Sequence, residues 1–318
     1  MSGIFRDIAV IGSGLMGSGI AQVFASRGYP VTIQAFEDTE EAVRNKIRSN
    51  MRLLMEHGIG DERLMEETLG RIRVTADLEE AVRGKDFVVE AVFENMELKQ
   101  NVFADLDRLC RRDAVLATNT SVMSITEIAS KARYRDRIVG THFWNPPYLI
   151  PLVEVTRAEH TSEETMDKTI RFLQEAGKHP VRVNKDVPGF VANRLQHALW
   201  REAISIVERG IADAKTVDEC IRYTLGLRLG VLAPLENSDM IGNDLTLSIH
   251  EYILKHIENA TEPSPLLKEK VARGELGFKS GKGFYDWTPE ETEASRRRLI
   301  AHLAKAVAEL GFVTQTKS

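Results

Sequence analysis

The chain reads IAVIGSGLMG over residues 8–17, an apolar run followed at once by a glycine-rich turn. Residues 18–27 then follow a helical pattern, so the turn joins a buried strand to a helix. A pyrophosphate needs backbone N–H groups and the positive end of a helix, and a Cβ in the turn would obstruct it. Gly12 permits the tight turn, Gly14 admits the phosphates and Gly17 lets helix and strand pack closely. The stretch predicts a dinucleotide site; the alternative is a flexible glycine loop.

Further short apolar runs along the first half of the chain predict more strands. They cover residues 31–35, 73–75, 87–92, 114–118, 138–142, 153–155 and 181–183. Helical patterns lie between most of them, which indicates parallel pairing in a doubly wound sheet. We therefore expect an α/β Rossmann-type dinucleotide-binding domain.

The pattern changes at the breaker Asp186-Val187-Pro188-Gly189-Phe190. Beyond it we find no convincing strand pattern, and i, i+3, i+4 periodicity dominates residues 191–210. We expect two domains, a Rossmann-type domain over residues 1–187 and an all-α C-terminal domain over residues 188–318.

Composition narrows the range of partners. The net charge is −5 with 42 Lys and Arg against 47 Asp and Glu, and no long basic block indicates nucleic acid or an anionic membrane as a partner. No secretory signal and no apolar stretch near the ~18 residues of a membrane span occurs, so we expect a cytoplasmic protein. Cys110 and Cys220 indicate packing residues, neither a disulfide framework nor a metal cluster.

His142 and Glu154 end two short strand-like segments on either side of the loop 143–151. A hairpin-like return would bring the imidazole and the carboxylate into contact. Such a carboxylate fixes the tautomer and leaves the other ring nitrogen free to exchange a proton with a substrate hydroxyl. The alternative is a His bonded to backbone and a Glu in a surface ion pair.

Ser121 follows a strand at its carboxyl end, where open α/β sheets present groups to ligands. The alternative is a helix cap. Either Ser121 or Ser124 would cap the helix that begins near Thr126.

These segments together form an ordered set of motifs. They are IGSGLMGSGIAQVFA (11–25), VVEAVFENMELKQNVF (88–103), TNTSV (118–122), THFWNPP (141–147), LVEV (152–155), VPGFVANRL (187–195) and KSGKGFYDW (279–287). Over nearly its whole length the chain resembles the L-3-hydroxyacyl-CoA dehydrogenases, enzymes of fatty acid metabolism.

The resemblance implies a role for each matched residue. His142 is expected to be the general base, Glu154 to orient it, and Ser121 and Asn193 to hydrogen-bond the reacting substrate. The residues expected near the dinucleotide are Gly12, Gly14, Leu15, Met16, Gly17, Glu94, Lys99, Ser121, Asn145 and Lys279. The alternatives are a solvated helix charge for Lys99 and an ordinary basic turn residue for Lys279. No metal site is expected.

The second strand departs from the family at its end, where an acidic residue normally accepts hydrogen bonds from the adenosine ribose. Ala35 stands at that position. Glu37 and Asp38 lie two and three residues further on, and either is expected to substitute for the acidic residue; Glu37 is the one assigned to the cofactor site. The charge of both residues disfavours a ribose 2′-phosphate. No Arg stands near Ala35, so NAD is the expected cofactor.

A second departure concerns coenzyme A. Met51 and Gly58 occupy the positions at which the family offers a Ser and a Lys to that ligand. The segments 45–54 and 145–151 look more like relatives that oxidise free acids or alcohols, such as L-gulonate dehydrogenase with its lens-crystallin form, carnitine dehydrogenase and a pyridine-alcohol dehydrogenase. Trp144, in the loop after His142, is interpreted as a packing aromatic in preference to one that narrows an acyl tunnel.

The resemblance implies an NAD-dependent L-3-hydroxyacyl-CoA dehydrogenase that converts a small-molecule 3-hydroxyacyl substrate reversibly into the 3-oxo compound. One alternative is a dehydrogenase of a free 3-hydroxy acid or related alcohol, and another is a non-catalytic dinucleotide-binding protein. The family uses its helical domain to dimerise, and apolar helical faces follow Val191. We therefore expect a homodimer.

Overall fold

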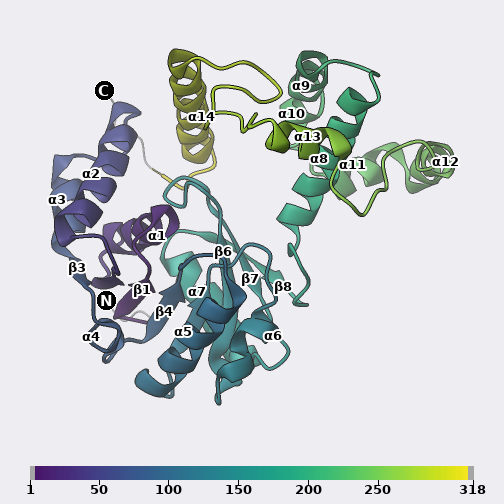
Figure 1. The fold of residues 1–318 in the computed structure, drawn as a ribbon. Helices are drawn as coiled ribbons and strands as arrows, with labels where there is room; N and C mark the ends of the chain where they lie inside the picture. The colour runs from purple at the N-terminus through teal and green to yellow at the C-terminus, as the bar shows by residue number, and fades with distance from the viewer. Residues whose placement is uncertain (1–3, 314–318) are drawn as a thin grey trace. The chain divides into compact units, whose positions relative to one another are not determined.

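The computed structural model describes residues 4–313 and is shown in Figure 1. Its contacts divide the chain into two compact units, a first unit of Met1–Asn193 with Arg298–Ser318 and a second unit of Arg194–Arg297. All the strands of the sheet belong to the first unit. The boundary between residues 187 and 188 stays a prediction.

The first unit is built on one eight-stranded sheet with the order β3-β2-β1-β4-β5-β6-β7-β8. The strands are β1 (Ile8–Ile11), β2 (Val31–Gln34), β3 (Ile72–Thr75), β4 (Phe87–Glu90), β5 (Val115–Thr118), β6 (Ile138–Phe143), β7 (Leu152–Thr156) and β8 (His179–Val183). The first six follow the 3-2-1-4-5-6 order of dinucleotide-binding folds, which confirms the predicted Rossmann-type domain. Among the strands of this sheet that the structure describes, only β6 and β7 pair antiparallel, and their register places His142 opposite Glu154.

Helices connect most of these strands. They are α1 (Leu15–Ser26), α2 (Glu40–Glu56), α3 (Glu62–Gly70), α4 (Leu78–Val82), α5 (Met96–Leu109), α6 (Ile125–Ile128), the short 3₁₀ helices η1 (Ala129–Lys131) and η2 (Arg135–Arg137), and α7 (Glu163–Glu175). Thr39, Asp61 and Asn95 cap α2, α3 and α5 through their side-chain oxygens. At α6 the cap is Ser124, which leaves Ser121 outside the helix.

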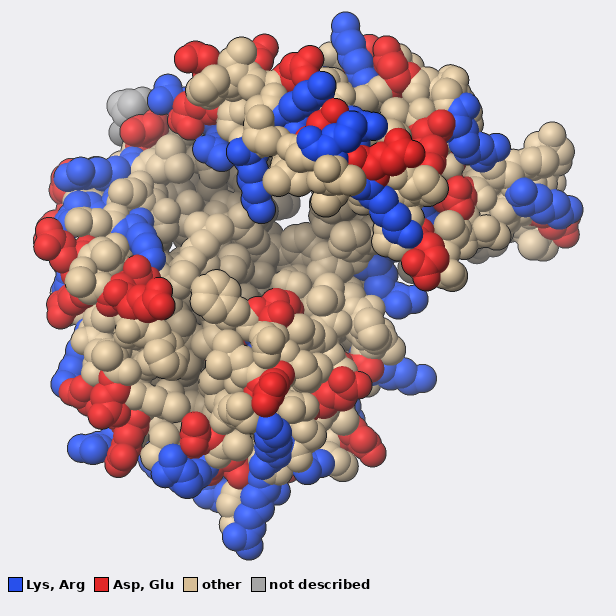
Figure 2. Space-filling model, in the orientation of Figure 1, with Lys and Arg blue, Asp and Glu red and all other residues tan. Residues whose placement is uncertain are grey.

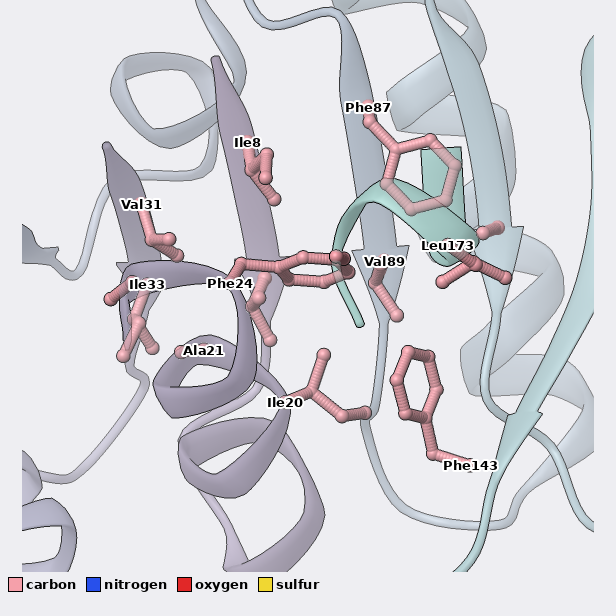
Figure 3. Close-up of a cluster of buried hydrophobic side chains, with 14 of the residues drawn as sticks. Ile8, Ile20, Ala21, Phe24, Val31, Ile33, Phe87, Val89, Phe143 and Leu173 are labelled. Atoms are coloured by element: carbon pink, nitrogen blue, oxygen red, sulfur yellow. The ribbon is translucent and has the colours of Figure 1, made fainter. Parts of the chain in front are cut away.

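Successive residues of the central strands point to opposite faces of the sheet, and both faces are buried. Ile8 and Val10 of β1 belong to a cluster that includes residues of α1, α2, α3 and α7. Their neighbours Ala9 and Ile11 belong to a second cluster with residues of α4, α5 and α6. Figure 3 shows Phe24, Phe87 and Phe143 among the aliphatic side chains of the first cluster. A sheet covered on both sides explains the nearly continuous apolar runs of its strands.

The second unit is helical, as predicted. The chain's remaining helices are α8 (Ala192–Glu208), α9 (Ala214–Tyr223), α10 (Leu225–Arg228), α11 (Pro234–Ile241), α12 (Asn243–Ile253), α13 (Pro265–Ala272) and α14 (Pro289–Glu309). Within Arg194–Arg297, all of which is described, no apolar residue is buried, and only Ser205 and Thr292 are. In the described part of the chain no helix has the length and apolarity to cross a bilayer.

The end of α14 returns to the first unit. Ala304 and Val307 pack in a small apolar cluster with Leu54, Ile59 and Leu149. Arg27 also donates a hydrogen bond of 3.2 Å to the carbonyl oxygen of Phe312. Residues assigned by sequence to the helical domain thus complete a surface of the α/β unit.

Candidate active site

The glycine turn between β1 and α1 has no room for side chains at two of its positions. Gly12 has φ +106°, and a Cβ there would lie 2.6 Å from the carbonyl oxygen of Ala91. A Cβ on Gly17 would lie 2.0 Å from the carbonyl oxygen of Gly12. At Gly14, by contrast, a Cβ would meet nothing within 4 Å. Gly12 and Gly17 are therefore required by the fold, whereas Gly14 borders open space.

The N-terminus of α1 fits the pyrophosphate of a dinucleotide. Gly14 is the N-cap residue and provides no side-chain hydrogen bond, and the first turn contains no acidic residue. Leu15 is exposed and Met16 half-buried, so the first turn lies at the surface. Uncapped N–H groups at the positive end of a helix form an anion site.

The acidic residue that contacts this turn is Asp38. Its carboxylate accepts hydrogen bonds from the Ser13 hydroxyl and from the Lys46 ammonium, both at 2.6 Å. Bonds from Lys46 and then Ser13 lower the pKa of the Asp38 carboxyl group. Ala35 is buried at the end of β2, and Glu37, the residue expected in the cofactor site, is exposed. The structure thus places Asp38 beside the turn and gives Glu37 no such contact.

His142 and Glu154 form a buried pair across β6 and β7. The His142 Nδ1 and Glu154 Oε2 atoms are 2.8 Å apart, and the residues are 5% and 0% exposed. The other carboxylate oxygen accepts hydrogen bonds from the backbone N–H groups of Val191 and Ala192. Burial alone would raise the pKa of Glu154, but the bonds from His142, Ala192 and Val191 lower it overall. The geometry agrees with the predicted hairpin-like return and leaves Nε2 as the second ring nitrogen.

The interpretation of Trp144 as a packing aromatic was incomplete. Its indole Nε1 donates a hydrogen bond of 3.3 Å to Glu154 Oε2, the same oxygen that His142 contacts. The Trp144 and His142 rings are 5.2 Å apart between centroids, at an interplanar angle of 56°. The indole is therefore a polar partner of the pair.

Lys99 and Glu94 belong to a charged network at the carboxyl ends of β4 and β5. The Lys99 ammonium lies 2.8 Å from Glu90 Oε1 and 3.1 Å from Glu94 Oε2. Lys99 is only 1% exposed, so the alternative of a solvated helix charge was wrong. Burial acts to raise the pKa of Glu94, but bonds from Thr120, Lys99 and Ser121 lower it. Lys99 therefore holds Glu94 instead of facing solvent itself.

Ser121 connects this network to the segment that follows the pair. Its backbone N–H donates to Glu94 Oε1 at 2.8 Å, and its carbonyl oxygen accepts from Asn193 Nδ2 at 3.0 Å. Asn193 directly follows Ala192, which binds Glu154. The structure thus brings together His142, Glu154, Ser121, Asn193 and Glu94.

Two predicted cofactor residues lie outside this network. Asn145 is exposed in the loop after β6. Lys279 is exposed in the second unit, between α13 and α14.

Sequence reasoning missed Glu90. This residue ends β4, is 0% exposed, and accepts hydrogen bonds from Lys99 and from the Thr118 hydroxyl. A charged residue closing an apolar strand was the available signal.

Among the described residues no three His, Cys, Asp or Glu side chains are grouped so as to hold a metal ion. Figure 2 shows Lys and Arg interspersed with Asp and Glu on the visible face.

Two family models match the chain. The model for 3-hydroxyacyl-CoA dehydrogenase, NAD binding domain, matches residues 7–187, and that for 3-hydroxyacyl-CoA dehydrogenase, C-terminal domain, matches residues 189–287. A probable 3-hydroxybutyryl-CoA dehydrogenase of Bacillus subtilis is 39% identical over 284 residues, which cover 89% of this chain and 97% of the relative.

A second relative has a different substrate in its name. The 5-formyl-3-hydroxy-2-methylpyridine 4-carboxylate 5-dehydrogenase of Mesorhizobium japonicum is 36% identical over 306 residues, covering 94% of this chain and 97% of the relative. A crystal structure of an enzyme of this kind, described as an NAD+ dependent dismutase, has a TM-score of 0.88 at 34% identity and covers 96% of this chain and 98% of its own. This protein is thus an NAD-dependent oxidoreductase acting on CH–OH groups and belongs to the 3-hydroxyacyl-CoA dehydrogenase family.

Proposed function

We propose that this enzyme oxidises an L-3-hydroxyacyl-CoA reversibly to the 3-oxoacyl-CoA, with His142 as the general base. The buried contact of 2.8 Å between His142 and Glu154 carries this proposal. Bound NAD+ supplies the acceptor for the hydride that leaves C3 of the substrate. His142 and its neighbours account for the proton.

The carboxylate of Glu154 determines which imidazole nitrogen reacts. Because Nδ1 contacts Glu154, Nε2 is the nitrogen that takes the proton of the substrate hydroxyl. The imidazolium that results is stabilised by the same carboxylate. In the reverse direction Nε2 returns the proton to the oxygen of the reduced substrate.

Ser121 and Asn193 are proposed to hydrogen-bond the reacting oxygen. Within the described residues the Ser121 hydroxyl forms no hydrogen bond, whereas its backbone is held by Glu94 and Asn193. A fixed backbone with an available hydroxyl provides a preorganised donor for an alkoxide-like oxygen. Glu94, Lys99, Asn145 and Lys279 are proposed to contribute to the dinucleotide site together with the glycine turn.

The test of the base is His142→Gln, with the exposed His160→Gln as the control. Loss of a general base is expected to lower kcat by about 10²- to 10⁴-fold. The dissociation constant for NADH, measured by fluorescence, is expected to change less than threefold, because the glycine turn is untouched. Full activity of His142→Gln would refute the role.

A free hydroxy acid is a second candidate substrate. Met51 is 4% exposed and belongs to the apolar cluster between the sheet and its helices, and Gly58 has φ +73° in the turn after α2. Neither residue supplies the Ser or Lys that coenzyme A meets in the family. The pyridine carboxylate named for the Mesorhizobium japonicum relative also lacks coenzyme A.

A substrate panel separates the two candidates. We would compare acetoacetyl-CoA with acetoacetate and with larger 3-oxo acids, each with NADH and with NADPH. Saturable turnover of the thioester at a kcat/KM at least tenfold higher supports the proposal. The opposite ratio supports the free acid.

We also propose that the protein is a homodimer formed through the second unit. That unit exposes many large apolar side chains, and it buries none. Its most exposed members are Tyr223, Leu227, Val231, Leu235, Met240 and Tyr252, all at least 66% exposed. A helical unit without a buried apolar core needs a second surface to cover it.

The mass in solution tests this proposal. The chain has a mass of 35.7 kDa, and light scattering is expected to give twice that value. Val231→Lys with Leu235→Lys is expected to shift the mass toward the monomer. A monomeric wild-type protein would contradict the proposal.

A further inference from the structure

We propose that Trp144 is a positioning residue that sets the pH range in which His142 gains and loses its proton. The inference rests on the proposed function of His142 as the base. It concerns a residue that sequence reasoning treated as packing. The two oxygens of Glu154 receive different donors, backbone N–H groups on one and side chains on the other.

Each oxygen of the Glu154 carboxylate accepts two hydrogen bonds. Oε1 accepts from the backbone N–H groups of Val191 and Ala192, at 3.0 and 2.9 Å. Oε2 lies 2.8 Å from His142 Nδ1 and 3.3 Å from Trp144 Nε1. The imidazole and the indole therefore compete for one oxygen.

This competition acts on the protonated form of His142. An imidazolium is stabilised by the negative charge on the oxygen that it contacts. A second N–H donor on that oxygen draws part of the charge toward itself and weakens the stabilisation. His142 is consequently expected to release its proton at a lower pH than it would without the indole. Val191 and Ala192 bind the other oxygen through their backbone N–H groups, which a side-chain substitution does not remove. A substitution of Trp144 therefore removes only the indole hydrogen bond to Oε2.

The charged and titratable groups on the elements packed against the pair are as follows. The segment 187–192 contains no ionisable side chain, and the loop 143–151 contains only Tyr148. On β5 and the residues directly after it, 115–121, no side chain is charged. On β8, the neighbour of β7, His179 contacts the Phe312 ring and Arg182 forms ion pairs with acidic residues of α7. Lys178 binds the carbonyl oxygens of Pro147 and Ile150 in the loop 143–151, and Glu94 binds the Ser121 N–H, but neither contacts the imidazole. Trp144→Phe leaves both of these charges in place, and the carboxylate shared with Trp144 is the charge that His142 contacts directly.

Trp144→Phe isolates the indole N–H because it keeps an aromatic ring beside His142. Oxidation requires neutral His142 and fails toward low pH, whereas reduction requires the imidazolium and fails toward high pH. Without the indole the imidazolium is more stable. The low-pH limb of the oxidation profile and the high-pH limb of the reduction profile are therefore both expected to move to higher pH, by about 0.5 unit or more.

The experiment measures kcat/KM against pH in both directions for the wild type, Trp144→Phe and the control Trp287→Phe. A packing role alone would change stability or KM without moving both limbs in the same direction. The imidazole of His142 is also titrated by NMR, with its signal assigned from His142→Gln. This readout needs no activity, so it remains usable if Trp144→Phe turns over poorly.

The possible outcomes separate the inference from the proposed function. An upward shift of both limbs and of the NMR midpoint supports the role of Trp144. An unchanged midpoint in a folded Trp144→Phe variant overturns it, even where His142→Gln is inactive. Full activity of His142→Gln would overturn the base itself, and the inference with it.

Discussion

Lys178→Met is expected to remove a pH dependence of stability that is built into the first unit. Lys178 is 8% exposed, and its ammonium donates to the carbonyl oxygens of Pro147 and Ile150 at 2.7 and 2.6 Å. Burial, with a smaller contribution from Arg27, lowers its pKa from 10.5 to about 7. The two accepting carbonyls belong to the loop that joins the His142 strand to the Glu154 strand.

The sign of the effect follows from proton binding. Between about pH 7 and pH 10.5 the unfolded chain keeps the Lys178 proton and the folded chain does not. The unfolded state therefore binds more protons, and the free energy of unfolding rises with pH. The slope is at most about 1.4 kcal/mol per pH unit, so a rise from about pH 7.5 to 9 adds up to ~2 kcal/mol. Below about pH 7 both states hold the proton, and Lys178 contributes no slope.

Urea unfolding at about pH 7.5 and about pH 9 measures the contribution of Lys178 to the free energy of unfolding. Wild type and the exposed-lysine control Lys185→Met are expected to gain stability between them. Lys178→Met cannot titrate and is expected to lose that part of the gain. Because the chain has two units, the comparison uses the transition reported by first-unit probes, such as hydrogen exchange of the sheet. Parallel pH profiles for wild type and Lys178→Met would refute the reasoning.

Three further predictions concern the cofactor turn and its neighbours. Gly14→Ala is expected to fold normally but to weaken NADH binding at least about tenfold, ~1.4 kcal/mol, in a fluorescence titration. Gly17→Ala is expected to weaken binding and also to lower the melting temperature. Equal changes of the melting temperature in the two variants would contradict this. Lys99→Met is expected to cost about 3–5 kcal/mol in urea unfolding because it leaves the buried Glu90 carboxylate without its cationic partner, and adding Glu90→Gln should recover part of that loss. Asp38→Ala is expected to raise kcat/KM with NADP relative to NAD, and an unchanged ratio would exclude Asp38 from cofactor selection.

The architecture of the sheet was predictable because its signals are local. Buried strands read as apolar runs whatever their neighbours are, and the turn at Gly12 requires a conformation that glycine adopts readily. The contact between His142 and Glu154 was also accessible, since a short loop between two strands forces an antiparallel return. These features depend on residues close together in the sequence.

The polar networks were less predictable because they depend on distances across the fold. A sequence does not show that Lys99 lies inward between two carboxylates, or that Asp38 instead of Glu37 reaches the turn. The hydrogen bond from Trp144 depends on the direction of one N–H group. Such directions are set by packing, which the apolar pattern constrains only coarsely.

The return of α14 to the first unit has a consequence for dissecting the molecule. The sequence predicts a domain boundary at residue 187. A fragment that ends there would lack the apolar side chains of Ala304 and Val307. Leu54, Ile59 and Leu149 would then face water, and such a fragment is expected to aggregate or to require detergent. Excising the dinucleotide-binding half cleanly requires grafting residues 298–313 back onto it through a short artificial linker.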